Sequence, residues 1–243
     1  GSKMNKKSRK LRMGVSFLIL FCAFIYSKNS TEINNYISKI IPINYTYAYS
    51  IENIPEYTDK EYIIINNNEP YFTEEDYTLT SFEKYSDLDL LGRCGVAYAN
   101  VGTDTMPTTE RGSIGMIKPT GWHTIKYDIV NGKYLYNRCH LIGYQLTGEN
   151  DNEKNLITCT RQMNIGPMLE YENKIADYIK QTNNHVLYRV TPVFKDSNLL
   201  ATGVEIEAYS VEDNGKGIKF NIFIYNVQKG IEIDYTTGDS KLK

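Results

Sequence analysis

Residues 137–172 read NRCHLIGYQLTGENDNEKNLITCTRQMNIGPMLEYE and contain one of the three histidines of the chain, His140. Two asparagines, Asn155 and Asn164, and a carboxylate, Glu172, follow it. A neutral imidazole accepts a proton from water near pH 7, and amide and carboxylate oxygens suit a hard divalent cation such as Mg²⁺. A lone histidine is more often structural than catalytic, so the polar residues downstream are what single out His140. Together these residue types indicate phosphodiester hydrolysis.

The charge of the chain is unevenly distributed. Residues 1–27 carry six basic side chains and no acidic one, namely Lys3, Lys6, Lys7, Arg9, Lys10 and Arg12. Removing those six from the 27 basic residues leaves 21 against 29 acidic residues, so the remainder is acidic. Proteins that bind nucleic acid through bulk charge are basic. Any binding of a polyanion must therefore be local, through a few arginines and a metal ion.

The amino-terminal segment has the composition of an export signal. Gly1 and Ser2 precede Met4 and look like the remnant of a tag, and the basic cluster then leads into MGVSFLILFCAFIY at 13–26. This run is shorter than the roughly 20 residues of a full membrane span, and it shows no evident A-x-A cleavage site. We predict an extracytoplasmic protein, favour an uncleaved anchor in the cell membrane, and leave secretion after cleavage open.

The cysteines allow at most one disulfide in the rest of the chain. Cys22 lies in the apolar segment and is expected to be unpaired, which leaves Cys94, Cys139 and Cys159. Which two of these three pair is left open. No CxxC spacing occurs, so a zinc site is not predicted.

The length of 243 residues accommodates one good-sized domain with attachments. We predict a signal or anchor segment at 1–27, a polar spacer at 28–50 and a domain at 51–243. Apolar residues at 168, 169, 175 and 178 predict an amphipathic helix that begins at Pro167. Residues 73–89 are expected to be partly helical. Strands are predicted around 61–65, 90–102, 122–127, 185–194, 199–211, 218–227 and 231–235.

Residues 137–140, NRCH, resemble the DRGH motif of the DNA/RNA non-specific endonucleases, which are ββα-metal (His-Me finger) nucleases. Within that family the chain is most similar to the EndA-like group of Gram-positive surface and secreted DNases. The similarity extends to LGRCGVAYANVG at 91–102, ERGSIGMIKPTGWHTIKYD at 110–128, the TRQMN…MLxxE pattern at 160–172, and 211–235. It covers 51–243, about four-fifths of the chain.

The resemblance implies an α+β fold in which a central antiparallel β-sheet is flanked by helices and a ββα-metal finger carries His140 and Asn164. It also implies a Mg²⁺-dependent endonuclease, with Mn²⁺ as a substitute, that cuts DNA without sequence specificity and leaves 5′-phosphates. RNA is a second candidate substrate. His140 would be the general base and Asn164 the metal ligand. Asn155 would hold the scissile phosphate or order the site, and Glu172, or less favourably Glu170, would accept a hydrogen bond from metal-bound water.

An arginine is expected to hold the phosphate, because its planar fork matches two oxygens. Arg138 and Arg111 rank first, ahead of Arg93 and Arg161, and each could instead form a structural ion pair. The corresponding structural alternatives are a helix cap for Asn164 and a solvated helix carboxylate for Glu172. The remaining candidates are expected to be structural, namely His123, His185 and Trp122.

The motif departs from the family at two positions, because Asn137 replaces aspartate and Cys139 replaces glycine. The lost carboxylate could orient an arginine or tune the histidine, so we expect altered activity or an altered pH optimum. One rival function is therefore a catalytically weak or inactive surface protein that binds nucleic acid for DNA capture or uptake. A delivered nuclease toxin is less favoured, because the amino terminus indicates export. No protein partner is predicted.

Overall fold

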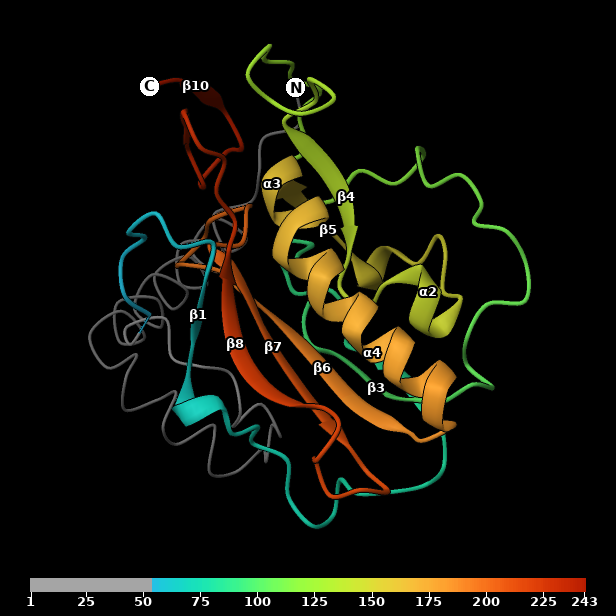
Figure 1. Cartoon of the computed structure of the whole chain (residues 1–243). Helices are drawn as coiled ribbons and strands as arrows, with labels where there is room; N and C mark the ends of the chain where they lie inside the picture. The colour runs from blue at the N-terminus through green and yellow to red at the C-terminus, as the bar shows by residue number, and fades with distance from the viewer. Residues whose placement is uncertain (1–53) are drawn as a thin grey trace, which may run out of the picture. The chain divides into compact units, whose positions relative to one another are not determined.

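A six-stranded antiparallel sheet forms the centre of the computed structural model, which describes residues 54–243 (Figure 1). Its strand order is β1-β8-β7-β6-β3-β2, and every neighbouring pair is antiparallel. The strands are β1 Tyr62–Ile64, β2 Phe82–Tyr85, β3 Ala97–Val101, β6 Val186–Val193, β7 Gly203–Ser210 and β8 Lys219–Tyr225. With helices on the sheet, this confirms the predicted α+β class.

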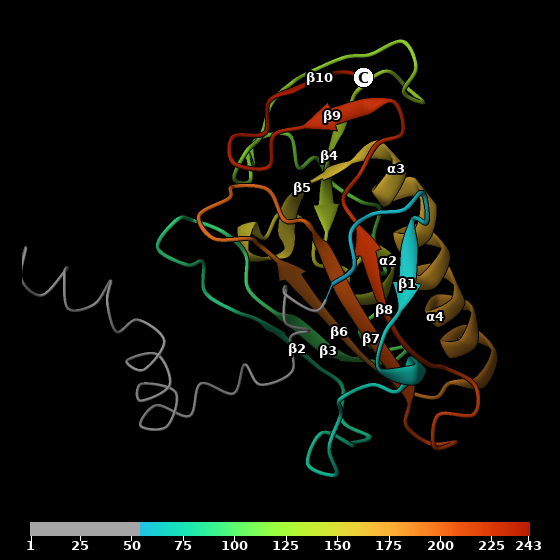
Figure 2. The ribbon, with the colours of Figure 1, turned by 90° about the vertical axis from the view of Figure 1, so that its left-hand side faces the viewer.

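The long helix α4, Leu169–Thr182, lies across one face of this sheet (Figures 1 and 2). Its buried residues Ile175, Ala176 and Ile179 recur at helical spacing and share a hydrophobic cluster with side chains of β6, β7 and β8. The helix ends where Asn183 adopts a left-handed conformation with φ 59°, and the Asn183 N–H donates to the carbonyl of Ile179. The sequence pattern thus predicted the helix, but of the apolar positions expected within it only Ile175 is fully buried, and Leu169 is exposed.

A separate two-stranded sheet precedes α4 and forms a ββα unit with it (Figure 1). Strand β4, Tyr136–His140, pairs antiparallel with β5, Leu156–Thr160. Between them lie α2 Tyr144–Thr147 and η3 Glu153–Asn155, and after them come α3 Arg161–Met163, the π-helical turn η4 Asn164–Met168, and α4. The predicted finger that carries His140 and Asn164 is therefore present.

The remaining elements are short. The 3₁₀ turn η2, Asn66–Asn68, follows β1 and ends its β-branched segment, as the three asparagines predict. Strands β9, Ile231–Ile233, and β10, Ser240–Leu242, form another two-stranded sheet.

Four local predictions need correction. Residues 73–89 contain turns and β2 instead of a helix, because the Asp76 carboxylate accepts the Thr73 N–H in a tight turn and Phe82–Tyr85 pairs with β3. The strand expected at 90–102 is confined to 97–101 and is next to the edge of the sheet. Residues 122–127 contribute a single bridge, Lys126 to Tyr134. Pro167 lies inside η4, so α4 begins two residues later than predicted.

The predictions for the amino terminus, 1–27 and 28–50, lie outside the described residues. Among residues 54–243, no helix has the length and apolar character needed to cross a membrane.

Candidate active site

His140 is the last residue of β4, and its imidazole is held in one tautomer. Its Nε2 lies 2.7 Å from the backbone oxygen of Asn150. A carbonyl oxygen only accepts hydrogen bonds, so Nε2 carries the proton and Nδ1 keeps its lone pair. Nδ1 lies 3.3 Å from Nη2 of Arg111. Since a guanidinium only donates, Nδ1 accepts this hydrogen bond, and the basic nitrogen of His140 faces Arg111.

The surroundings keep this imidazole neutral. Burial lowers the pKa of His140 below its ordinary value of 6.5, the Asn150 carbonyl raises it, and the positive charge of Arg111 lowers it further. The side chain is only 8% exposed. A histidine with a lowered pKa stays unprotonated at neutral pH, which is the state that a general base requires.

Asn164 is held by a chain of two hydrogen bonds that begins at Arg161. Nη1 of Arg161 donates to Oδ1 of Asn137 at 3.2 Å, and Nδ2 of Asn164 donates to the same oxygen at 3.0 Å. Because a guanidinium can only donate, the oxygen of Asn137 must be the acceptor and the Asn164 amide must present its nitrogen to it. The Oδ1 atom of Asn164 accepts no hydrogen bond from the residues that the structure describes, so it is available to a ligand.

Local backbone chemistry explains why Asn164 begins a widened turn. Pro167 has no N–H, so it cannot form the hydrogen bond to the carbonyl four residues earlier that an α-helix requires. The chain between α3 and α4 therefore takes the five-residue π-helical turn η4, with Asn164 as its first residue. The turn brings Asn164 to Asn137 on β4.

A pocket of about 480 Å³ lies at this point and is lined by Asn137, Asn164 and three arginines, Arg111, Arg138 and Arg161. No carboxylate is among its lining residues. It therefore presents positive charge and hydrogen-bond donors, although the chain as a whole is slightly acidic.

The arginines differ in what neutralises them. Arg93 and Arg189 lie outside the pocket and each pairs with a carboxylate, Asp89 at 2.7 Å and Glu207 at 2.6 Å. Within residues 54–243 the three arginines of the pocket form no ion pair. Arg93, predicted as a secondary phosphate ligand, is thus a structural ion pair, and the uncompensated guanidinium groups are concentrated in the pocket.

Arg138, expected together with Arg111 as the first candidate for holding the phosphate, already donates to backbone carbonyls. Its guanidinium donates to the carbonyl of Ile117 and, at 2.9 Å, to that of Gly115, and it lies 3.9 Å from the ring centroid of Trp122. These contacts fasten the loop before β4 to the strand. Arg111 and Arg161 have more free donors, so Arg111 stays a first candidate for holding a phosphate and Arg161 takes the place of Arg138.

Asn155 and Glu172 act on the backbone that follows His140. Asn155 is fully buried and uses both ends of its amide on Ile142, accepting from its N–H at 2.9 Å and donating to its carbonyl at 3.0 Å. Glu172, 7% exposed, accepts the Gly143 N–H at 2.8 Å. Of the two roles predicted for Asn155, the structure favours ordering the site. Neither side chain lines the pocket that contains Asn164.

Burial changes the ionisation of Glu172. It raises the pKa of this carboxyl to about 8, against the opposing effects of the Gly143 N–H and the charge of Arg111. The solvated helix carboxylate considered for this position is therefore wrong. The less favoured Glu170 is exposed and pairs with Lys174 at 2.7 Å.

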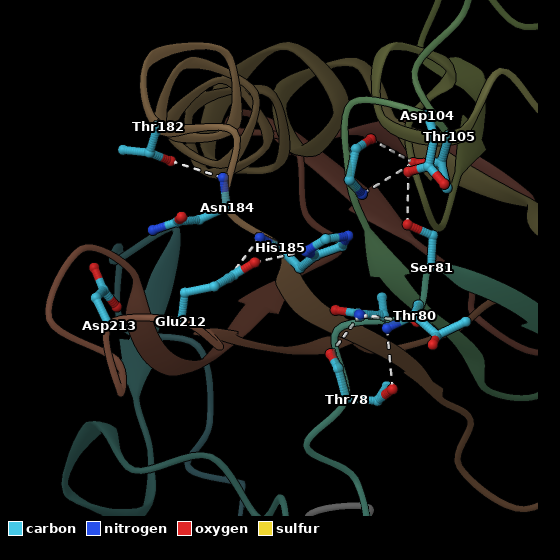
Figure 3. A network of polar contacts seen from close by, with 12 residues as sticks. Thr78, Thr80, Ser81, Asp104, Thr105, Thr182, Asn184, His185, Glu212 and Asp213 are labelled. Carbon is cyan, nitrogen blue, oxygen red and sulfur yellow. Dashed lines mark hydrogen bonds and ion pairs between the residues drawn. The ribbon is translucent and has the colours of Figure 1, made fainter.

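The other two histidines have structural contacts, as expected. Nδ1 of His185 lies 2.6 Å from Oε1 of Glu212, and Figure 3 shows this pair within a polar network that also includes Ser81 and Asp104. Nε2 of His123 lies 3.0 Å from the carbonyl of Thr237. No histidine lines the pocket of Asn164, but His140 alone of the three contacts one of its arginines, Arg111.

The two departures from the family motif have direct structural consequences. Asn137 supplies the oxygen that orients Asn164, a role that a neutral amide can fill. Cys139 is bonded to Cys159 on β5, with 5.9 Å between the Cα atoms, whereas Cys94 is a free, buried thiol. Neither contact could be read from the sequence, because each depends on the register of β4 with β5 and on the turn that follows.

Comparison with known proteins agrees with this geometry. Residues 73–212 match the family model described as DNA/RNA non-specific endonuclease. The chain is similar to NucA from Streptococcus agalactiae in its metal-free structure, with 26% identity, a TM-score of 0.68, and coverage of 79% of this chain and 92% of NucA. It is also similar to the Sda1 nuclease with a bound zinc ion, with 25% identity, a TM-score of 0.62, and coverage of 80% and 99%. The family match spans more than half of the chain and includes β4, β5 and α4, so the chain belongs to the DNA/RNA non-specific endonuclease family and is a nucleic-acid hydrolase.

Proposed function

We propose that the chain is a Mg²⁺-dependent, sequence-non-specific endonuclease that hydrolyses DNA, and RNA as a second substrate, to 5′-phosphate products. The observation that carries the proposal is the state of His140, whose Nε2 is bonded to the Asn150 carbonyl and whose Nδ1 is left basic beside Arg111. This is the tautomer that a general base needs, and its basic nitrogen meets Arg111, which lines the cationic pocket although His140 itself does not.

The donors present suit a divalent cation held by few protein ligands. The free Oδ1 of Asn164 is a hard oxygen donor in a pocket where substrate phosphate would be drawn by arginines. Mg²⁺ keeps several waters and commonly takes one or two protein oxygens plus phosphate, and Mn²⁺ accepts similar ligands. In residues 54–243 there is no group of three or more His, Cys, Asp or Glu residues that could hold a metal. NucA and Sda1 have been solved with magnesium and zinc bound, respectively.

In the proposed reaction His140 removes a proton from water through Nδ1 as the water oxygen attacks phosphorus. The bond from phosphorus to the 3′ oxygen breaks and that oxygen takes a proton from a water molecule, so one product carries a 5′-phosphate and the other a 3′-hydroxyl. Arg111 and Arg161 hold non-bridging oxygens of the phosphate. The metal, when bound, stabilises negative charge on the phosphate and on the leaving oxygen. Contacts to the backbone alone carry no base specificity.

The supporting residues keep these groups in place. Asn155 and Glu172 fix the backbone of Ile142 and Gly143 directly after His140. A Cβ at position 143 would lie 2.4 Å from Oε2 of Glu172, so a larger residue there would displace this carboxylate. A hydrogen bond from metal-bound water to Glu172 remains a prediction.

The proposed location is extracytoplasmic. The disulfide between Cys139 and Cys159 is of a kind that persists in oxidising compartments. This agrees with the export signal predicted at 1–27, and membrane anchoring by that segment remains a prediction from the sequence.

The test is degradation of supercoiled plasmid by the purified protein with Mg²⁺. Wild type is expected to nick and then degrade the plasmid, whereas EDTA and His140→Ala should abolish cleavage. His123→Ala, which removes an imidazole that meets the Thr237 carbonyl and no arginine of the pocket, is the matched control and should remain active. Ligation of the products to a 3′-hydroxyl acceptor tests for 5′-phosphates. A wild type that stays inert with Mg²⁺ and Mn²⁺ from about pH 6 to 9 would overturn the proposal and favour a nucleic-acid-binding surface protein.

A further inference from the structure

One aromatic side chain of the described chain is left largely open to solvent. Tyr134 is 46% exposed, and it is the single aromatic among the exposed large hydrophobic residues of 54–243. It lines the same pocket as Asn164, Arg111 and Arg161. A singly exposed hydrophobic residue is ordinary. An exposed ring beside unpaired guanidinium groups is a more specific combination.

The backbone holds Tyr134 firmly at this rim. It forms a bridge with Lys126, and the next residue, Leu135, is fully buried and donates its N–H to the carbonyl of Ile125. Strand β4 starts directly afterwards. The ring is therefore carried by a short hairpin that leads into the strand of His140, so its position relative to the site is well defined.

A second ring lines the same pocket, and both rings have a cation nearby. Trp122 lines the pocket and lies under the guanidinium of Arg138, 3.9 Å from the ring centroid. Nζ of Lys126 lies 4.5 Å from the centroid of Tyr134. Proteins that bind single-stranded nucleic acid combine these two features, cationic groups for the backbone and aromatic faces for the bases.

We propose that Tyr134, in the pocket that Trp122 also lines, forms a subsite for an unstacked base next to the phosphate held by Arg111 and Arg161. The placing of that phosphate rests on the proposed nuclease function. In a duplex both faces of a base are covered by its neighbours, so only an unpaired base can stack on Tyr134. The substrate class favoured by this subsite is single-stranded nucleic acid.

The test compares two substrates with the same phosphates. One is single-stranded dT12, and the other is a twelve-unit oligomer of abasic tetrahydrofuran spacers, each incubated with the purified full chain and Mg²⁺. Wild type is expected to cut dT12 with a kcat/KM about 10-fold higher than the abasic oligomer. Tyr134→Ala should remove most of that preference, and Tyr134→Phe, which keeps the ring, should retain it.

The control variant is Phe82→Ala, which truncates a ring that also has a lysine over it, Lys84 at 5.0 Å, but which is on β2 outside the pocket. It should keep the preference for dT12. Melting temperatures of all variants identify any loss of fold. If Tyr134→Ala lowers cleavage of both oligomers equally, or changes neither, the subsite does not exist.

A binding measurement separates this inference from the proposed catalysis. Fluorescence anisotropy of labelled dT12 and of the abasic oligomer is recorded with His140→Ala, alone and combined with Tyr134→Ala. Preferential binding of dT12 that disappears with Tyr134 supports the subsite even if wild type cuts nothing. Equal binding of both oligomers by His140→Ala overturns it even if wild type is an active nuclease.

Discussion

The residue that burial changes most in this site is Glu172. Its carboxyl accepts the Gly143 N–H and has a pKa raised to about 8 from 4.5, with burial as the main cause. Between these two pH values the folded protein keeps a proton that the unfolded chain releases. Unfolding then releases a proton, so the contribution of Glu172 to stability falls as the pH rises from about 4.5 to about 8. His140 has a lowered pKa, so its contribution to stability rises with pH over the range in which it titrates.

We predict that Glu172→Gln removes the fall in stability that Glu172 causes as the pH rises. Glutamine keeps a carbonyl oxygen for Gly143 and carries no charge, so without metal the variant should be more stable than wild type at pH 8, by a few degrees in Tm. The advantage should shrink at pH 5, where the wild-type carboxyl is protonated. Thermal denaturation in EDTA at both pH values measures it. Glu170→Gln, an exposed carboxylate two residues away, should show no such difference, and a pH-independent effect of Glu172→Gln would contradict the argument.

At the scale of elements, the ββα unit depends on a covalent link between its two strands. Cys139 and Cys159 are 20 residues apart in sequence and join β4 to β5 on either side of the α2 and η3 segment. The double variant Cys139→Ser/Cys159→Ser should lower the free energy of unfolding by about 3 kcal/mol, because the unfolded chain gains loop entropy. Urea denaturation measures this. Cys94→Ser is the control, since that thiol is free and only donates to backbone carbonyls.

A reducing agent gives an independent check on the same element. It should lower the stability of wild type to that of the double serine variant and leave the double variant unchanged. Equal loss in both proteins would show that the strands are not held by this bond.

At the scale of the whole molecule, charge is segregated. Beyond residue 27 the chain carries 21 basic and 29 acidic residues, yet the candidate active site is lined by three arginines and no carboxylate. Contacts to nucleic acid should therefore be few and local, and the dependence of binding on salt should be shallow. Arg161→Ala should reduce the slope of log K against log salt by about one phosphate contact. Anisotropy at several salt concentrations measures the slope, and Lys180→Ala, on the exposed side of α4, should leave it unchanged.

Much of the fold was predictable from the sequence because the spacing of apolar residues along the chain indicates its strands and its long helix. The apolar runs of β6, β7 and β8 and the helical spacing of α4 need only neighbouring residues to be recognised. The structure of residues 73–89 was not predictable in this way. Their acidic residues are compatible with a helix, and only pairing with β3 selects the strand at Phe82–Tyr85. The intrinsic preference of a segment for helix or strand predicts its structure poorly where pairing with a distant strand decides the outcome.

The sequence by itself singled out the candidates for the site, since His140, Asn164 and the arginines stand out by residue type and by the family motif. Their partners were decided only by the tertiary structure. Asn137 meets Asn164, Cys139 meets Cys159, and Glu172 meets Gly143 across separations of 20 to 29 residues. Such contacts follow from the pairing of β4 with β5 and from the direction in which η4 starts α4. Hydrogen bonds, disulfides and pKa values depend on distances of a few ångströms, and no local pattern along a chain specifies those.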